Sequence, residues 1–457
     1  MAKISLRKLF DKEPKKKKSK IKDVSEKEKK YVAIAFTMLA LFCIIIFSAA
    51  LTPKSFQNDT FYTIKIGQDI RKNGIDYVDH YSWHDNLPYM YPHWLYDVVT
   101  SLVYDFLGGF NGLYIVTMIF SCILGVILYF ANKKFSKNEF VSFVMTMIQM
   151  YLMKDYIAAR AQLVTFILFV GTIILIEKYL EKPKIGYAIG LIIIPIVIAN
   201  IHSAVFPFYF VLYLPYIGEY VINIILDSHI YYKVYQFILK LYIKIENKRL
   251  KKAKKSQTEY YKKKIIELNK KIVESNEKFE KFLLKQSEKR KSPYKIKYSL
   301  NKNTNKLFII MIICIFTGLL SPLKDMPYTY TYKIMKGNTT ASVSEHLPTV
   351  IIENKEILLA YAIFFALTIF TKTKLSLKDW FLVGGMGLLA LMSRRQISML
   401  VLFGGLVLSK IIADLFYKYD KKGTTTMLCL MTTVPRRNCN IIFSNFIMCC
   451  SIQTKNE

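Results

Sequence analysis

Long apolar stretches recur along this chain and restrict the folds that are open to it. They lie at residues 31–51, 113–131, 140–153, 163–180, 186–199, 204–225, 307–320, 357–371, 380–392 and 397–415. The hydrocarbon core of a bilayer takes about 20 apolar residues per helix, and backbone inside it must satisfy its own hydrogen bonds. We therefore predict an all-α polytopic membrane protein with about ten transmembrane helices.

The charge distribution fits this topology. The net charge is +32, but the lysines sit in a few hydrophilic blocks that alternate with the apolar stretches. Such alternation is the positive-inside pattern, and no aromatic platform of a nucleic-acid-binding protein accompanies it. We expect a multi-pass cell-membrane protein with a cytoplasmic N-terminus, membrane lipids as partners and no nucleic-acid binding.

The composition predicts five segments. A basic cytoplasmic tail (1–30) precedes an N-terminal transmembrane module (31–230) that contains an extracytoplasmic loop at 52–110. A lysine-rich insert (231–306) has apolar residues near heptad positions over about three heptads, which predicts a cytoplasmic helical hairpin, interpreted as a solvated basic insert near anionic lipid. A C-terminal transmembrane module follows (307–416). The atypical tail (417–457) holds four of the seven cysteines and resembles a frameshifted end.

The extracytoplasmic loop concentrates the polar chemistry of the chain. Residues 59–109 contain seven aspartates and two of the three tryptophans. Apolar residues at a spacing of three and four predict two helices, at 60–73 and 93–107, and glycines follow both. Both are amphipathic and suit the membrane interface. The cysteines offer this loop neither a disulfide framework nor a zinc spacing.

Ionisable residues also lie at the predicted outer ends of the apolar stretches. They are Asp59, Arg160, His202, Asp325 (beside Pro322), Arg394 and Arg395. Charged groups at the membrane edge are costly and usually face a cavity or each other, although a single arginine can also extend its head group to the interface. Because several such positions fall on one side of the membrane, we predict a site there.

Structural roles compete with functional ones for the other polar residues. Most polar loop residues serve turns, which covers Asp79, His80, Trp83 and His84. Asp97 fits the wet face of an interfacial helix, and the 200–202 segment fits an interhelical hydrogen-bonded pair. For Glu345 and His346, a solvated loop is favoured over a ligand pair.

Several short motifs together carry a family resemblance. The first loop contains Asp59, a helix ending I-x-x-x-G at 70–74, DHYSW at 79–83 and WLYD at 94–97; RAQ at 160–162, NIH at 200–202 and SRR at 393–395 follow. This layout resembles the GT-C-like integral-membrane glycosyltransferase superfamily, and specifically a broad set of bacterial multi-spanning proteins with a GT-C-like first outer loop. The resemblance covers residues 31–415, apart from the insert.

The resemblance implies a polyprenyl-phosphate-linked sugar donor and an envelope acceptor at the outer face. It implies Asp59 as general base and Arg160 with Arg394 or Arg395 as phosphate clamps. His93 and His202 would position substrate or assist acid–base chemistry. The remaining substrate-binding candidates are Trp94, Asp97 and Asp79. GT-C enzymes commonly have paired acids where this chain has Asn58-Asp59, so no metal motif is evident and the cofactor stays unknown.

Two other function classes fit the same topology. A transporter or flippase of a lipid-linked or anionic substrate predicts inverted repeats and helices broken at mid-membrane. Prolines 195, 207 and 215 occur without a matching half, and the charges lie at the ends of the stretches. A non-catalytic envelope membrane protein descended from such an enzyme is the third class.

Overall fold

The computed structural model describes residues 26–85, 87–228, 230–253, 255–291, 296–297, 301–336, 343–350, 355–370 and 373–416. The predicted atypical tail (417–457) and residues 1–25 of the basic tail lie outside these ranges. Contacts divide the chain into two units, and the larger is Ala40–Gly423. Only residues 26–39 of the smaller unit are described, so the packing discussed below is that of the larger unit.

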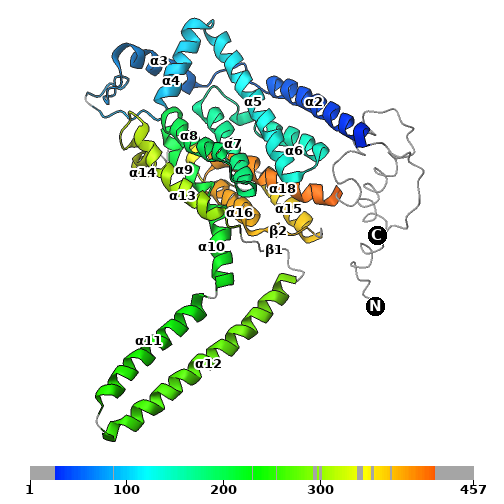
Figure 1. The fold of residues 1–457 in the computed structure, drawn as a ribbon. Coiled ribbons are helices and arrows are strands. Elements are labelled where there is room, and N and C mark those ends of the chain that lie inside the picture. The colour runs from blue at the N-terminus through cyan, green and yellow to red at the C-terminus, as the bar shows by residue number, and fades with distance from the viewer. Residues whose placement is uncertain are drawn as a thin grey trace, which may run out of the picture. The chain divides into compact units, whose positions relative to one another are not determined.

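The described residues are largely helical, as predicted (Figure 1). The α-helices described in the first half are α2 (Glu26–Ala50), α3 (Asn58–Asn73), α4 (Trp94–Phe106), α5 (Phe110–Ser136), α6 (Glu139–Leu152), α7 (Ala161–Glu181), α8 (Ile185–Ile201), α9 (Phe206–Val211) and α10 (Leu214–Ser228). Those that follow are α11 (Ile230–Lys252), α12 (Lys255–Lys291), α13 (Thr304–Ile315), α14 (Met326–Lys336), α15 (Lys355–Phe370), α16 (Leu377–Met392), α17 (Ile397–Met399) and α18 (Gly405–Phe416).

Short irregular turns separate several of these helices. The 3-10 segments are η1 (Lys154–Tyr156), η2 (Ser203–Val205), η3 (Phe316–Leu320), η5 (Ser344–His346) and η6 (Arg394–Gln396), and η7 (Leu400–Gly404) is π-helical. The described strands, β1 (Ile296–Lys297) and β2 (Leu375–Ser376), form one short parallel pair that the all-α prediction did not include.

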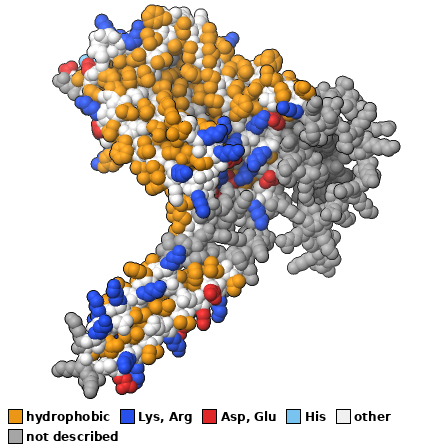
Figure 2. Space-filling view, in the orientation of Figure 1, with side chains coloured by type: hydrophobic (Ala, Val, Ile, Leu, Met, Phe, Trp, Pro, Cys, Tyr) orange, Lys and Arg blue, Asp and Glu red, His pale blue; other side chains and the backbone are white. Residues whose placement is uncertain are grey.

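Five helices in the described ranges are long and apolar enough to cross a membrane. They are Lys30–Ala50, Phe110–Ser136, Ala161–Glu181, Ser203–Ile225 and Arg394–Leu415. Four shorter apolar helices accompany them: Glu139–Leu152, Ile185–Ile201, Thr304–Leu320 and Leu359–Ile369. At 1.5 Å per residue, the 14-residue α6 reaches about 21 Å, less than the roughly 30 Å hydrocarbon core. The five long helices support a helical membrane protein, whereas α6 alone is too short to cross the hydrocarbon core. The surface over the bundle is largely hydrophobic (Figure 2).

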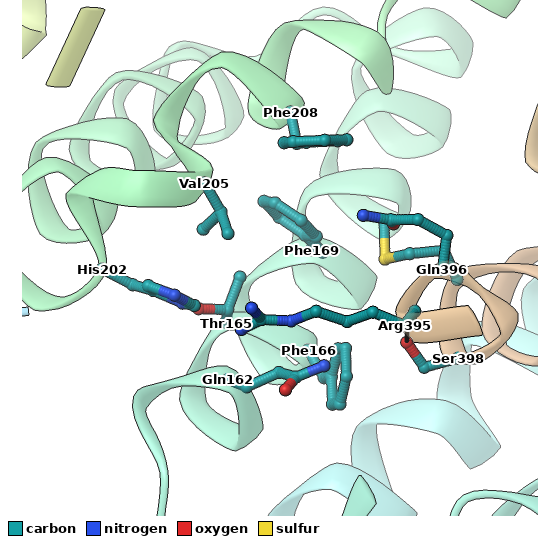
Figure 3. A pocket seen from close by; sticks show the side chains of 11 residues that line it. Gln162, Thr165, Phe166, Phe169, His202, Val205, Phe208, Arg395, Gln396 and Ser398 are labelled. Atoms are coloured by element: carbon teal, nitrogen blue, oxygen red, sulfur yellow. Dashed lines mark hydrogen bonds between the residues drawn. The ribbon is translucent and has the colours of Figure 1, made fainter. Parts of the chain in front are cut away.

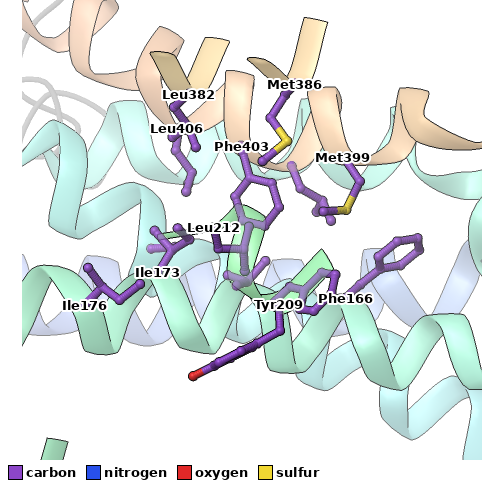
Figure 4. Close-up of a cluster of buried hydrophobic side chains, with 14 of the residues drawn as sticks. Phe166, Ile173, Ile176, Tyr209, Leu212, Leu382, Met386, Met399, Phe403 and Leu406 are labelled. Carbon is purple, nitrogen blue, oxygen red and sulfur yellow. The ribbon is translucent and has the colours of Figure 1, made fainter. Parts of the chain in front are cut away.

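The core of the bundle forms around α7. One face of this helix buries Phe166, Ile173 and Ile176. Tyr209 and Leu212 from the α9 segment, and side chains from α16, α17, η7 and α18, pack against that face (Figure 4). Apolar residues on every side of α7 explain this central position, because a helix without a polar face is stable only when surrounded.

At two helix irregularities, polar side chains donate hydrogen bonds to backbone carbonyls that lack helical partners. Pro195 has no N–H, which frees the Leu191 carbonyl one turn earlier, and the Tyr209 hydroxyl donates to that carbonyl at 2.6 Å. The π-helical turn η7 likewise leaves carbonyls without helical partners. Gln149 Nε2 donates to the carbonyls of Val401 and Leu402, both at 2.9 Å. Both bends thus keep their backbone groups paired inside the apolar core.

The predicted loop helices are present as α3 and α4. The α3 helix ends at Gly74, whose φ of +81° suits glycine, and α4 begins after His93. The two helices touch at Gly67, where an added Cβ would lie 2.0 Å from the Asp97 carbonyl oxygen. This close backbone approach holds the middle of α3 against α4.

Gly67→Val is therefore expected to destabilise the protein by about 1–3 kcal/mol, because α3 and α4 must separate to admit the side chain. Thermal unfolding of the purified protein in detergent measures the effect. Gly171→Ala is the control, since its added Cβ meets no heavy atom within 4 Å and alanine favours helix by about 0.5–1 kcal/mol. Equal melting temperatures for Gly67→Val and wild type would show that the two helices do not pack backbone to backbone.

Candidate functional site

A cavity of about 230 Å³ lies where several helix ends and loops meet. The lining residues come from the chain before α3, the η1 turn, the start of α7, the second loop and η6: Gln57, Asp155, Tyr156, Ala158, Arg160, Gln162, Glu345, Arg394 and Arg395. We call this the outer cavity. Three of the predicted arginines lie in its wall, although they are far apart in sequence.

Arg160 joins the first loop to the second. Its Nη2 lies 2.6 Å from Asp59 Oδ2, and its Nη1 lies 3.5 Å from Glu345 Oε1. The third guanidinium nitrogen, Nε, is buried and has no hydrogen-bond partner among the described residues. A buried N–H without an acceptor is costly, so one donor of this guanidinium is left unsatisfied by the described residues.

Local structure fixes the positions of Arg160 and Asp59. The Arg160 backbone N–H donates to the Ala158 carbonyl at 2.8 Å, in a tight turn that leads into α7. Asp59 lies in the first turn of α3, where a carboxylate is favoured by the helix dipole. The next residue, Thr60, is buried and donates to the Ala159 carbonyl at 3.5 Å. This contact brings the two turns together.

Glu345 was expected in a solvated loop, and its side chain is 49% exposed, yet this loop is fixed against the bundle. The residue lines the outer cavity, and the segment around it is fastened to the end of α16. Ser393 Oγ donates to the Glu345 carbonyl at 3.0 Å, and the Arg394 N–H donates to the Leu347 carbonyl at 3.1 Å. These two hydrogen bonds, which local sequence does not reveal, position the Glu345 carboxylate near Arg160.

The two neighbouring arginines are held differently. The Arg394 carbonyl accepts a hydrogen bond from the Tyr156 hydroxyl at 3.2 Å. Arg394 lines the outer cavity. The side chain of Arg395 extends into a smaller, inner cavity of about 40 Å³ and points toward Thr165 and His202 (Figure 3). Arg395 and Gln162 line both cavities. No carboxylate of the described residues forms an ion pair with Arg395.

His202 closes the inner cavity as a neutral ring. Its Nδ1 lies 2.9 Å from Thr165 Oγ1, and that hydroxyl is placed to donate to the Ala161 carbonyl at 3.1 Å. We infer that Nδ1 carries the proton and that Nε2 is free to accept. Burial holds the pKa of His202 well below its usual value, and the positive charge of Arg395 adds to this effect.

His93 and Asp97 form a second pair beside the inner cavity. Nδ1 of His93 lies 2.5 Å from Asp97 Oδ1, and the Asp97 side chain is buried. Burial raises the pKa of Asp97, an effect that His93 and Thr63 partly offset. The rings of His93 and His202 meet edge to face at 6.3 Å between centroids. Asp97 therefore orients His93, and it is not the wet face of an interfacial helix.

The segment around His93 docks on the end of α8. Trp94 Nε1 donates to Asn200 Oδ1 at 3.3 Å, and Ser203 Oγ donates to the Pro92 carbonyl at 3.0 Å. The sequence motifs at 94–97 and 200–202 are thus in direct contact. Trp94 and Asn200 satisfy each other, which supports a structural role for this pair.

Asp79 lies apart from both cavities. Its Oδ1 accepts from the backbone N–H groups of Tyr81 and Ser82 at 2.8 and 3.2 Å, which is an Asx turn. Asp325 lines neither cavity and interacts with Thr329 and Lys333 of α14. Their proposed place in the site therefore has no geometric support.

Metal binding was left open by the sequence. Among the described residues, no group of three or more His, Cys, Asp or Glu side chains is arranged to hold a metal ion. The polar chemistry in the two cavities is that of guanidinium, carboxylate, imidazole and amide groups.

Comparison with known proteins gives no further guide to this site. Neither the models of known protein families nor the curated proteins include a match to this chain. The function must be argued from the geometry described above.

Proposed function

We propose that this protein transfers a sugar from a polyprenyl-phosphate donor to a hydroxyl acceptor at the outer face of the cell membrane. The observation that carries the proposal is the meeting of Arg160, Arg394, Arg395 and Glu345 around one cavity, with Asp59 paired to Arg160. We place this cavity at the outer surface of a multi-pass protein with about ten spans, a cytoplasmic N-terminus and a GT-C-like first loop.

The charges in the cavity favour a phosphate ligand. Guanidinium groups bind phosphate oxygens in a bidentate manner, and these pairs are stronger where water is excluded. Arg160 has a buried Nε–H without an acceptor, and Arg395 projects into the inner cavity without a carboxylate partner. A lipid-linked phosphate would supply oxygen atoms to both.

The same geometry suggests how Asp59 becomes available as a base. Its carboxylate pairs with Arg160 at 2.6 Å. A donor phosphate would compete for that guanidinium and release the carboxylate. The Asp59 side chain is 65% exposed, so the released carboxylate could contact an acceptor. Because Asp59 contacts Arg160, it would lie beside an acceptor that meets a donor bound at this guanidinium.

The proposed reaction is a displacement at the anomeric carbon of the donor sugar. The acceptor hydroxyl attacks the anomeric carbon of the donor sugar and gives its proton to Asp59. The bond between that carbon and the phosphate oxygen breaks, and its electron pair leaves with the polyprenyl phosphate. Arg160, Arg394 and Arg395 would stabilise the charge on the departing phosphate. The oriented His93 and the neutral His202 would position the donor from the inner side.

A genetic experiment tests the reaction and identifies the sugar. The gene is deleted in its source organism, and wild type is restored at its normal membrane level. Lipid-linked sugars and envelope glycans are then profiled by mass spectrometry, with and without prior treatment of intact cells by a membrane-impermeant oxidant that modifies only sugars at the outer face. We expect one glycan to disappear on deletion, its polyprenyl-phosphate sugar to accumulate at the outer face, and wild type to reverse both changes.

Other outcomes of this profile separate the alternatives. If the lipid-linked sugar accumulates at the inner face, the protein moves its substrate across the membrane and does not transfer it. If no glycan or lipid-linked sugar changes, the transferase proposal is wrong and a non-catalytic role in the envelope is favoured.

A further inference from the structure

Helix α11 exposes a continuous apolar stripe although it belongs to a lysine-rich hairpin. Six of its apolar side chains are 40–67% exposed: Val234, Phe237, Ile238, Leu241, Tyr242 and Ile245. Their spacing of three or four residues places them on one face of the helix. Figure 2 shows hydrophobic side chains at the surface of the hairpin among lysine and arginine. We call these six residues the α11 stripe.

The opposite face of α11 is already occupied by α12. Leu239 is 6% exposed, Gln236 Nε2 donates to Asn276 Oδ1 at 2.5 Å, and the ring of Tyr232 meets Phe279. The buried Glu246 pairs with Lys264 across the hairpin at 3.0 Å. These contacts confirm the predicted helical hairpin and leave the α11 stripe outside it. The stripe must be explained by something other than the hairpin itself.

Chain connectivity places the stripe near a membrane. The candidate span Ser203–Ile225 ends only a few residues before α11 begins at Ile230. The first turns of α11 therefore start at headgroup level, where an amphipathic helix can bury one apolar face between lipids. Phe237 and Tyr242 are of the types that suit this depth.

Positive charge lies along one edge of the stripe. Lys233, Lys240 and Lys244 are exposed, and their helical positions fall on the same side of it. Lysines beside an apolar face attract anionic headgroups, and each contributes about fivefold to membrane partitioning. An apolar stripe with a cationic edge is complementary to an anionic lipid surface.

We propose that the α11 stripe lies in the headgroup region of an anionic leaflet, next to the span that precedes it. The hairpin would then be a lipid-binding element that responds to surface charge, and not simply a solvated insert. This inference does not depend on the proposed sugar transfer.

The test uses the full-length protein in nanodiscs, with its seven cysteines replaced by serine or alanine. A nitroxide is attached at Phe237→Cys in the stripe or, as control, at Asn247→Cys on the polar side of α11. Collision rates with oxygen and with a water-soluble nickel chelate are measured by electron paramagnetic resonance. Discs contain phosphatidylcholine alone or mixed with phosphatidylglycerol.

We expect the ratio of oxygen to nickel collisions at position 237 to exceed that at position 247 in the mixed discs. Lys233→Gln, Lys240→Gln and Lys244→Gln combined should remove most of this difference. Equal ratios at the two positions in mixed discs would overturn the proposal. A difference that is the same in both lipids would overturn its anionic part, and dipolar broadening between two labelled copies would assign the stripe to self-association instead.

Discussion

Asp59→Asn is expected to lower the rate of the proposed sugar transfer by about 10²–10⁴, the usual contribution of a general base. The amide cannot accept the acceptor's proton, yet it keeps the size of the side chain at the start of α3. Donor binding should persist, because loss of the carboxylate leaves Arg160 more available to the phosphate. The measurement is transfer by the purified variant, with the donor and acceptor that the glycan profile identifies.

Asp79→Asn is the matched control for this prediction. Asp79 belongs to the same loop, but its Oδ1 serves the turn through the N–H groups of Tyr81 and Ser82. An asparagine oxygen can accept the same two hydrogen bonds, so we expect transfer within about twofold of wild type. An Asp59→Asn variant as active as Asp79→Asn would exclude Asp59 as the base.

Arg395→Gln is expected to have the second-largest effect, through the donor phosphate. Loss of one donor that stabilises a developing charge typically costs about 10²–10³ in rate. Arg395 has no ion pair with a described carboxylate, so its removal leaves no buried acid uncompensated. The loss should appear in kcat/KM for the lipid-linked donor and leave thermal unfolding nearly unchanged.

Arg71→Gln provides the matched arginine control. Arg71 pairs with Asp105 at 2.5 Å between the two loop helices and lines neither cavity. Because exposed ion pairs contribute little, this variant should retain donor turnover. If Arg71→Gln lowers kcat/KM as much as Arg395→Gln, the loss reflects disturbance of the loop or of overall charge, and the inner cavity does not seat the phosphate.

Features encoded locally could be predicted from the sequence. Gly74 ends α3 because its positive φ suits glycine, and apolar spacing of three and four located α4 and the hairpin. The grouping of Arg160, Arg394 and Arg395 was predicted because each lies at the end of an apolar stretch. The structure brings these side chains into one cavity.

Features that depend on tertiary contacts could not be predicted. Glu345 looked like an ordinary loop residue because its ion pair with Arg160 depends on how the second loop fastens to α16. Asp79 looked like a site residue because its motif contains polar and aromatic groups, yet a local Asx turn accounts for it.

The relation between Asp59 and Arg160 links the fold to the proposed chemistry. Gly67 lets α3 lie against α4, and Thr60 meets the turn before Arg160. The carboxylate and the guanidinium are therefore positioned by packing before any ligand arrives. Such preorganisation reduces the cost of arranging the site when a donor binds.

We propose above all that the cavity binds the phosphate of a polyprenyl lipid. Native mass spectrometry of the purified protein tests this binding most directly. Wild type and Arg395→Gln are incubated with polyprenyl phosphate or with the uncharged polyprenol of the same length. We expect wild type to retain the phosphate and not the alcohol, and Arg395→Gln to lose most of that retention. Equal retention of both lipids by wild type, or equal retention of the phosphate by both proteins, would contradict it.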